Sequence, residues 1–125
     1  MFQIDSRDST PIYAQIERAL RAAIASGRLK IGDQLPTVRE MAVDLRVNAN
    51  TVARVYSDLE RQGVLETRRG VGTFISASPA KARSPNEHQR RLRAFATRVL
   101  ADAAAAGFTA DEVIGQLKSH REEGE

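Results

Sequence analysis

Two helix-start signals follow one another closely in the first half of the sequence. The stretch Thr37-Val38-Arg39-Glu40 has the spacing of a capping box, in which the threonine and glutamate side chains satisfy free backbone donors at a helix start. Asn48 is suited to cap a further helix that ends near Gly63, with a buried stripe of Val52, Val55 and Leu59. Two helices, the first over about 38–45, joined by a tight turn form a helix-turn-helix.

The flanking segments indicate how this motif is completed. Apolar residues at helical spacing predict a first helix that stops at Gly27. Thr10 is its expected cap and Pro11 its expected first residue. A loop follows, with at most a very short strand at Gln34-Leu35. After the helix-turn-helix, β-branched and apolar runs flank Arg69-Gly70-Val71-Gly72, which is typical of a β-hairpin. A basic hairpin in this position is the wing of a winged helix.

The composition changes after the hairpin and predicts a boundary. Residues 77–86 are rich in Ala, Ser, Pro and basic side chains, and Pro79 and Pro85 disfavour a regular element. A helical pattern then runs to Gly107, and a second capping box at residues 109–112 begins a final short helix. We therefore expect a mainly α fold with a small β-hairpin: a winged helix-turn-helix over 1–76, a linker over 77–86 and a helical hairpin over 87–125.

The predicted helical hairpin has more apolar surface than it can bury. Two short helices cannot close a core by themselves, and the same surface on a second copy provides the simplest cover. The sequence thus predicts a homodimer through a stripe on both helices, consisting of Leu92, Phe95, Val99, Val113, Ile114 and Leu117.

Length and composition exclude several classes of function. A chain of 125 residues with 42% hydrophobic content holds one compact core and a small accessory element. The sequence has no cysteine, and His88 and His120 lack partners at metal-ligand spacing, so we expect no catalytic site, metal or cofactor. Neither a signal peptide nor a membrane span is present, which predicts a soluble cytoplasmic protein. The arginine-rich composition, with a net charge of +3, permits a nucleic-acid partner.

Three stretches of the sequence, residues 35–42, 47–56 and 59–74, resemble the DNA-binding domain of the GntR family of bacterial transcription regulators. Within that family, the Asn-x-Asn-Thr-Val-x-Arg-x-Tyr pattern at 48–56, the Pro11-Ile12-Tyr13 opening and the short tail resemble the YtrA-like subgroup. The resemblance implies a repressor that binds a pseudo-palindromic operator in double-stranded DNA as a homodimer. It also implies an association with operons for membrane transporters.

The residues themselves agree with DNA binding. Arg39 lies beside a helix start and can clamp a phosphate, although spacing alone favours a solvated ion pair with Asp44 equally. On the longer helix, one polar face offers Asn and Arg, which pair bidentately with adenine and guanine edges. Asn48 is suited to phosphate, or only to capping. The predicted DNA contacts are Arg39, Asn48, Asn50, Thr51, Arg54, Ser57, Arg68, Arg69, Gly70 and Gly72.

One departure from the family affects specificity. Relatives often carry base-contacting arginines at the positions of Ala49 and Ala53. The alanine side chain cannot donate a hydrogen bond, so direct readout is expected from Asn50 and Arg54.

Tyr56 either packs in the core, which we favour, or reaches a phosphate. Two other functions stay open: an adaptor that binds another protein, and an architectural protein that binds DNA without sequence preference. The pattern shows no ligand pocket and leaves the effector unknown; if a small molecule acts, we expect it between the helical hairpin and the winged helix.

Overall fold

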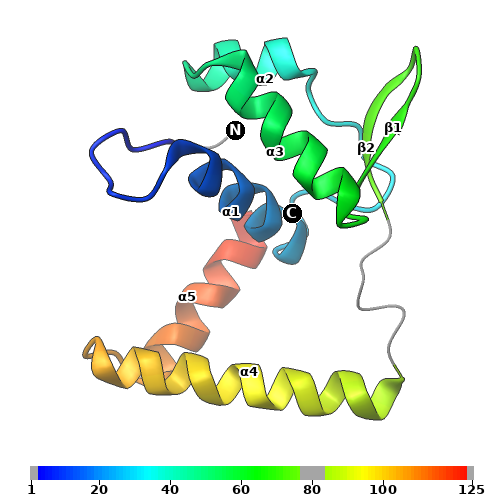
Figure 1. Cartoon of the computed structure of the whole chain (residues 1–125). Helices are drawn as coiled ribbons and strands as arrows, with labels where there is room; N and C mark the ends of the chain where they lie inside the picture. The colour runs from blue at the N-terminus through cyan, green and yellow to red at the C-terminus, as the bar shows by residue number, and fades with distance from the viewer. Residues whose placement is uncertain (1–2, 77–83, 124–125) are drawn as a thin grey trace. The chain divides into compact units, whose positions relative to one another are not determined.

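In the computed structural model, the helices and strands come in the predicted order and form two compact units, Met1–Ser78 and Pro79–Glu125 (Figure 1). The structure describes residues 3–76 and 84–123. The first unit contains α1 (Ile12–Ala25), α2 (Val38–Leu45), α3 (Ala49–Arg61), β1 (Leu65–Arg68) and β2 (Gly72–Ile75), and the second contains α4 (Pro85–Ala105) and α5 (Ala110–Glu123). The predicted mainly α fold is confirmed. Within the described ranges, no helix has the length and apolar character to cross a membrane.

The caps of α2 and α3 create the helix-turn-helix. The Thr37 hydroxyl accepts a hydrogen bond from the Glu40 N–H at 3.1 Å, and the Glu40 carboxylate accepts one from the Thr37 N–H at 3.0 Å. At the start of α3, the Asn48 side-chain oxygen accepts a hydrogen bond from the Asn50 N–H at 2.7 Å. Between the helices, Arg46 has a φ of 58°, in the left-handed region that favours glycine. The predicted capping box and asparagine cap are confirmed.

The start of α1 differs from the prediction by one residue. Pro11 caps the helix with extended backbone, and Ile12 is its first residue. The prediction that Thr10 is the cap was wrong because both its N–H, at 2.8 Å, and its hydroxyl donate to the Asp8 carboxylate, in a local turn that precedes the helix. Gln15 ties this turn to α1, since its side-chain amide donates to the Thr10 carbonyl oxygen at 2.9 Å.

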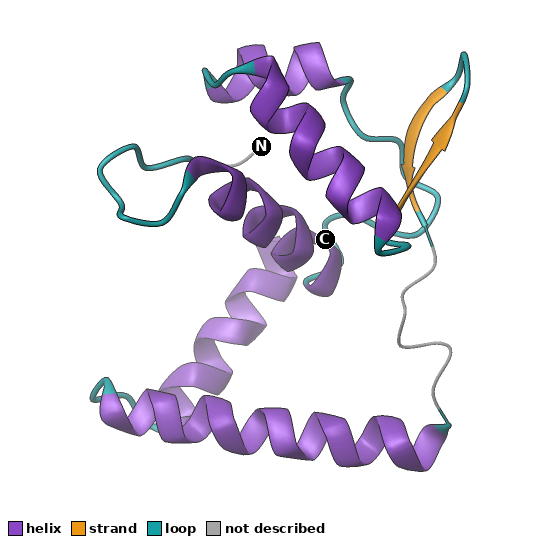
Figure 2. Ribbon diagram, viewed as in Figure 1, coloured by secondary structure: helices purple, strands orange, loops and turns teal. Residues whose placement is uncertain are grey.

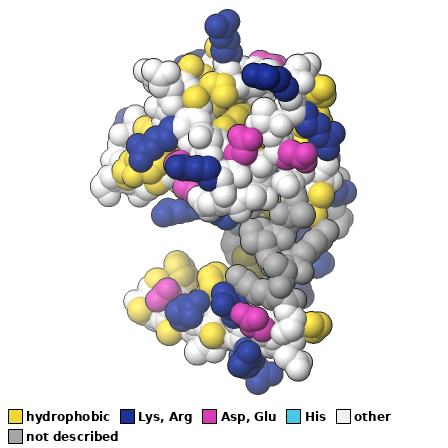
Figure 3. All heavy atoms as spheres, turned by 45° about the vertical axis from the view of Figure 1, so that its right-hand side comes forward, with side chains coloured by type: hydrophobic (Ala, Val, Ile, Leu, Met, Phe, Trp, Pro, Cys, Tyr) yellow, Lys and Arg dark blue, Asp and Glu magenta, His cyan; other side chains and the backbone are white. Residues whose placement is uncertain are grey.

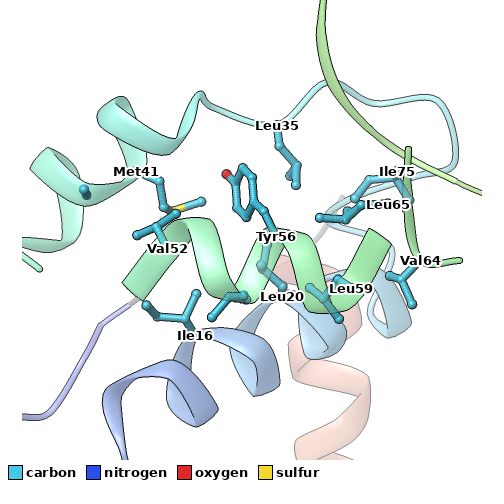
Figure 4. Close-up of a cluster of buried hydrophobic side chains, with 12 residues drawn as sticks. Ile16, Leu20, Leu35, Met41, Val52, Tyr56, Leu59, Val64, Leu65 and Ile75 are labelled. Atoms are coloured by element: carbon cyan, nitrogen blue, oxygen red, sulfur yellow. The ribbon is translucent and has the colours of Figure 1, made fainter. Parts of the chain in front are cut away.

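The hydrophobic core lies around α3, between α1, α2 and the hairpin (Figure 4). Val52 and Leu59 on α3 are fully buried, and the Tyr56 ring packs beside them with only 6% of its surface exposed. The Tyr56 hydroxyl donates to the Pro36 carbonyl oxygen at 2.7 Å, so the predicted core position of this ring is confirmed. Because one face of α3 is buried in this way, its opposite face is held toward the surface.

The wing is an antiparallel hairpin in which Leu65 pairs with Ile75 and Arg68 pairs with Gly72. The predicted very short strand is a single bridge between Gln34 and Phe74. This bridge places the loop before α2 against β2 and thereby connects the wing to the helix-turn-helix.

In the second unit, α4 begins earlier than expected. The prediction of a linker to residue 86 was wrong at its end, because Ser84 caps α4 through the Glu87 N–H and Pro85 is the first helical residue. A proline is favourable there because its missing N–H would have no partner within the helix. The rest of the predicted linker, residues 77–83, lies outside the described residues.

The second capping box is confirmed at the start of α5, where Thr109 and Glu112 exchange hydrogen bonds of 2.9 and 3.2 Å. The helices α4 and α5 meet at the turn around Gly107 and diverge from it (Figure 2). The predicted hairpin is therefore open, and much of its apolar surface stays uncovered.

Candidate nucleic-acid interface

The polar face predicted on α3 is present. Asn50, Arg54, Ser57 and Arg61 are exposed, whereas Val52, Val55 and Leu59 on the opposite side are buried. In the space-filling view, Lys and Arg side chains project from the N-terminal unit with acidic side chains between them (Figure 3). Asparagine and arginine on an exposed helix can donate hydrogen bonds to base edges in a major groove.

Arg54 is held at this face by two neighbours. Its guanidinium carbon lies 3.9 Å from the centre of the Tyr13 ring on α1, within the range of a cation–π contact. Its Nε lies 4.0 Å from a carboxylate oxygen of Asp58, and the side chain keeps 58% of its surface exposed. Tyr13 was not predicted as a site residue. The available signal was its place in the Pro11-Ile12-Tyr13 opening, but no local pattern connects that residue to α3.

The residues at the start of α3 surround the helix end that carries a partial positive charge. Asn48 and Asn50 are exposed and Thr51 is half-buried. Free N–H groups and the helix dipole attract anions at such an end. The side-chain oxygen of Asn48 is already used in the cap, which leaves its side-chain N–H₂ group and its neighbours to meet a phosphate.

Arg39 lies in the first turn of α2, beside the capping box, and its side chain is exposed. The hydrogen bonds from the backbone and side chain of Thr37 hold the pKa of the Glu40 carboxyl below its usual range. Glu40 therefore stays ionised at neutral pH and maintains the cap that precedes Arg39.

The wing carries Arg68 and Arg69, both exposed. The Arg68 guanidinium lies 4.3 Å from the centre of the Phe74 ring and 3.8 Å from a Glu66 carboxylate oxygen. Gly72 has a φ of 144°, and a Cβ at this position would come within 2.4 Å of the Gln34 side-chain nitrogen. That nitrogen donates to the Val71 carbonyl oxygen at 3.1 Å, so the loop before α2 supports the wing here. The positive φ favours glycine at position 72, and any larger residue would also displace the end of the Gln34 side chain.

All ten residues of the predicted DNA-contact set lie in the first unit, on α2, on α3 with its cap, and on the wing. In Figure 1, α2, the start of α3 and the wing tip lie at the top of this unit. Within the ranges that the structure describes, no cluster of His, Cys, Asp and Glu is arranged to hold a metal ion. The arrangement offers cationic and amide donors on a rigid helical support, which suits an anionic polymer better than a small ligand.

Residues 12–75 match the model of the gntR family of bacterial regulatory proteins. Over 118 residues the chain is 40% identical to the HTH-type transcriptional repressor YtrA from Bacillus subtilis, and the match covers 94% of this chain and 90% of that repressor. The chain belongs to the GntR family. It is a DNA-binding transcription regulator, with its GntR domain formed by α1 to β2.

Solved structures of GntR proteins support the same fold. YtrA from Sulfolobus acidocaldarius, a GntR-family transcription factor, superposes with a TM-score of 0.59 at 33% identity, over 79% of this chain and 96% of that one. The DNA-binding domain of AraR, solved in complex with operator ORE1, superposes with a TM-score of 0.52 at 29% identity. That match covers 61% of this chain and 95% of the AraR chain. The winged helix-turn-helix is therefore the architecture that this GntR regulator shares with an operator-bound relative.

Proposed function

We propose that this GntR regulator represses transcription as a homodimer that binds a pseudo-palindromic operator, with one copy of α3 in each half-site. The observation that carries the proposal is the exposed face of α3, on which Asn50, Arg54 and Ser57 are fixed outward because the other face is buried. A recognition helix of this kind reads base edges in the major groove. An isologous dimer presents two such helices, which matches a two-fold symmetric operator.

The remaining residues of the site are assigned by their chemistry. Arg39, Asn48 and Thr51 lie at helix starts and hold phosphates, which position the protein without reading sequence. Arg68 and Arg69 on the wing grip the backbone or the minor groove, and Gly70 and Gly72 let the wing approach closely. Asn50, Arg54 and Ser57 are the direct readers of base identity.

Dimerisation is assigned to α4 and α5. Leu92, Phe95, Ile114 and Leu117 keep between 48% and 62% of their surface exposed, and Val99 and Val113 are half-buried. Leu100 and Phe108, which were not in the predicted stripe, add to this exposed apolar surface. An unpaired surface of this kind on two diverging helices is best covered by the same surface of a second copy.

The regulated genes are inferred from resemblance alone. The similarity to the YtrA-like subgroup leads us to place the operator upstream of an operon for a membrane transporter. Bacterial operator DNA is cytoplasmic, so the regulator would act there. No effector is proposed.

The test is the affinity of the protein for DNA upstream of its own operon, measured by gel shift and fluorescence anisotropy against random DNA of equal length. We expect a specific complex that contains two copies of the chain per site. Arg28→Ala, an exposed arginine after α1 and outside the predicted contact set, serves as the charge-matched control and should leave binding unchanged. A protein-binding adaptor would give no complex, and an architectural protein would bind both DNAs equally; either outcome contradicts the proposal.

A further inference from the structure

The contact between Arg54 and Tyr13 joins two helices that are distant in sequence. The core packs α1 against α3, and Tyr13 is a half-buried residue that packs against this core. Its ring is therefore held by its own packing and gives the Arg54 guanidinium a fixed surface at 3.9 Å. The flat face of a guanidinium suits such a ring, and this contact leaves the N–H groups at its edge available for hydrogen bonds.

Asp58 also lies beside the Arg54 guanidinium. Its carboxylate lies 4.0 Å from the Arg54 Nε and also forms an ion pair with Arg61, one turn further along α3. A carboxylate on a face that meets DNA repels phosphates, so it lowers affinity unless it has a compensating role. Asp58 lies between two arginines of the α3 face, which indicates that its role is to orient them.

We propose that Tyr13 and Asp58 are positioning residues that hold the Arg54 guanidinium ready to pair with a guanine. This inference rests on the proposed reading of a base by Arg54. The ring covers one face and the carboxylate lies beside Nε, which directs the two terminal amino groups to the O6 and N7 acceptors of guanine. A long, rotamer-rich side chain that is already ordered loses less conformational entropy when it binds.

The first test compares Tyr13→Leu, which removes the ring, with Tyr13→Phe, which keeps it. Affinities are measured on a library of operator variants with every base pair of a half-site changed in turn, and on random DNA. Tyr13→Leu should weaken cognate binding by about 2- to 10-fold per half-site and leave binding to random DNA nearly unchanged. Tyr13→Phe should retain the wild-type preference. A Tyr13→Leu protein with tighter cognate binding would show that the ring withholds Arg54 from DNA and would overturn the proposal.

Asp58→Asn gives a second test that does not alter the packing of α1. The loss of a negative charge should raise affinity for random DNA, and the loss of orientation should lower the ratio of cognate to random affinity. An unchanged or increased ratio would remove Asp58 from the positioning set.

A third comparison separates this inference from the proposed function. In an Arg54→Ala background, Tyr13→Leu should have no further effect on base preference, because its effect acts through Arg54. If Arg54→Ala itself leaves every preference intact, then base reading by Arg54 is wrong and the positioning role fails with it. If Arg54→Ala removes a preference that Tyr13→Leu leaves at its wild-type strength, only the positioning role is overturned.

The contact can also be measured without DNA. The Arg54 Nε–H resonance in the NMR spectrum of the free protein should experience the ring current of residue 13 in wild type and Tyr13→Phe and lose it in Tyr13→Leu. Wild-type and Tyr13→Leu resonances at the same position would overturn the proposal, and thermal unfolding of each variant shows that the fold is kept.

Discussion

Arg54 lies in the middle of the exposed face of α3, where a recognition helix comes nearest to the bases. Its neighbours Ala49 and Ala53 cannot donate hydrogen bonds from their side chains, so the proposed direct readout rests on few residues. Other single residues have consequences for the fold: Arg46 adopts a backbone conformation that suits glycine, and Tyr56 buries a phenol beside the capping box of α2.

Replacement of Arg54 by alanine should separate base reading from backbone binding. If Arg54 pairs with a guanine, Arg54→Ala should cost about 1–3 kcal/mol per half-site on the cognate operator and much less on random DNA. The measurement is the set of affinities for an operator library, in which one base pair of each half-site should lose its preference. An equal loss on all sequences would assign Arg54 to phosphate binding.

Replacement of Arg46 by glycine should stabilise the protein. The φ of 58° at the end of α2 costs a side-chain-bearing residue energy that glycine avoids. We expect Arg46→Gly to raise the free energy of unfolding by about 0.5–1 kcal/mol, measured by chemical denaturation. Arg46→Ala, which removes the charge but keeps the Cβ, is the matched control and should give no such gain.

Tyr56 should ionise only in strongly alkaline solution. Burial, with a smaller contribution from the negative charge of Glu40, raises its pKa to about 12. Since the folded pKa lies above the ordinary value of 10.0, the stabilising effect of the neutral phenol is complete below pH 10 and is lost as the pH rises toward 12. A difference titration of tyrosinate absorbance between wild type and Tyr56→Phe should show this, and a Tyr56 signal that appears near pH 10 in the folded protein would contradict it.

The helices and the wing support the proposed DNA contacts in different ways. The capped start of α2 carries Arg39, the capped start of α3 carries Thr51, and the wing depends on Gln34 beneath Gly72. These supports are hydrogen bonds between side chains and the backbone, so each group of proposed phosphate contacts is attached to an ordered element. Each phosphate contact releases counterions from the DNA. The number of phosphate contacts therefore determines how steeply affinity falls as the salt concentration rises.

Removal of the Arg39 charge should therefore change the salt dependence of binding. We expect the dimer to make roughly 6–10 phosphate contacts. The logarithm of its binding constant should then fall by about 0.9 per contact for each tenfold increase in salt concentration. Arg39→Ala should weaken specific and random DNA alike and reduce this slope by about 1.8, one contact from each copy. Fluorescence anisotropy over a series of salt concentrations measures the slope. A slope equal to that of wild type would remove Arg39 from the phosphate set.

In the proposed function, the first unit contacts DNA and the second unit associates with a second copy. Unit Met1–Ser78 has its own core around α3, whereas α4 and α5 bury little more than Ala103. The large exposed apolar side chains of the second unit are unusual for a surface that stays in water, and they are the basis of the proposed dimer.

A charge within that apolar surface should separate the copies. Phe95→Asp buries a carboxylate in each half of a symmetric interface, so we expect the dissociation constant of the dimer to rise at least about 100-fold. Light scattering should give the mass of a monomer, and operator affinity should fall because the half-sites are then bound independently. Val43→Asp, the same kind of change at a valine on α2 that is 79% exposed, should stay dimeric. A dimeric Phe95→Asp protein would place the interface elsewhere.

Local sequence was sufficient where the determinants of structure lie a few residues apart. The capping boxes at Thr37 and Thr109, the Asn48 cap and the amphipathic pattern of α3 each act within one or two helical turns, so α2, α3 and the orientation of the α3 polar face were predictable. The same locality explains the hairpin, whose turn residues and β-branched strands are adjacent in the chain.

Competition between polar groups that are neighbours in the chain, and packing between distant segments, determined the rest. Thr10 does not cap α1 because Asp8 and Gln15 bind it in a turn, and competition between nearby polar groups is not resolved by residue type alone. The Tyr13 ring meets Arg54, and the Gln34 side chain lies against Gly72, only because the core brings α1 to α3 and the loop to the wing. No periodicity encodes such contacts, since they depend on where folded elements meet in space rather than on the spacing of residues along the chain.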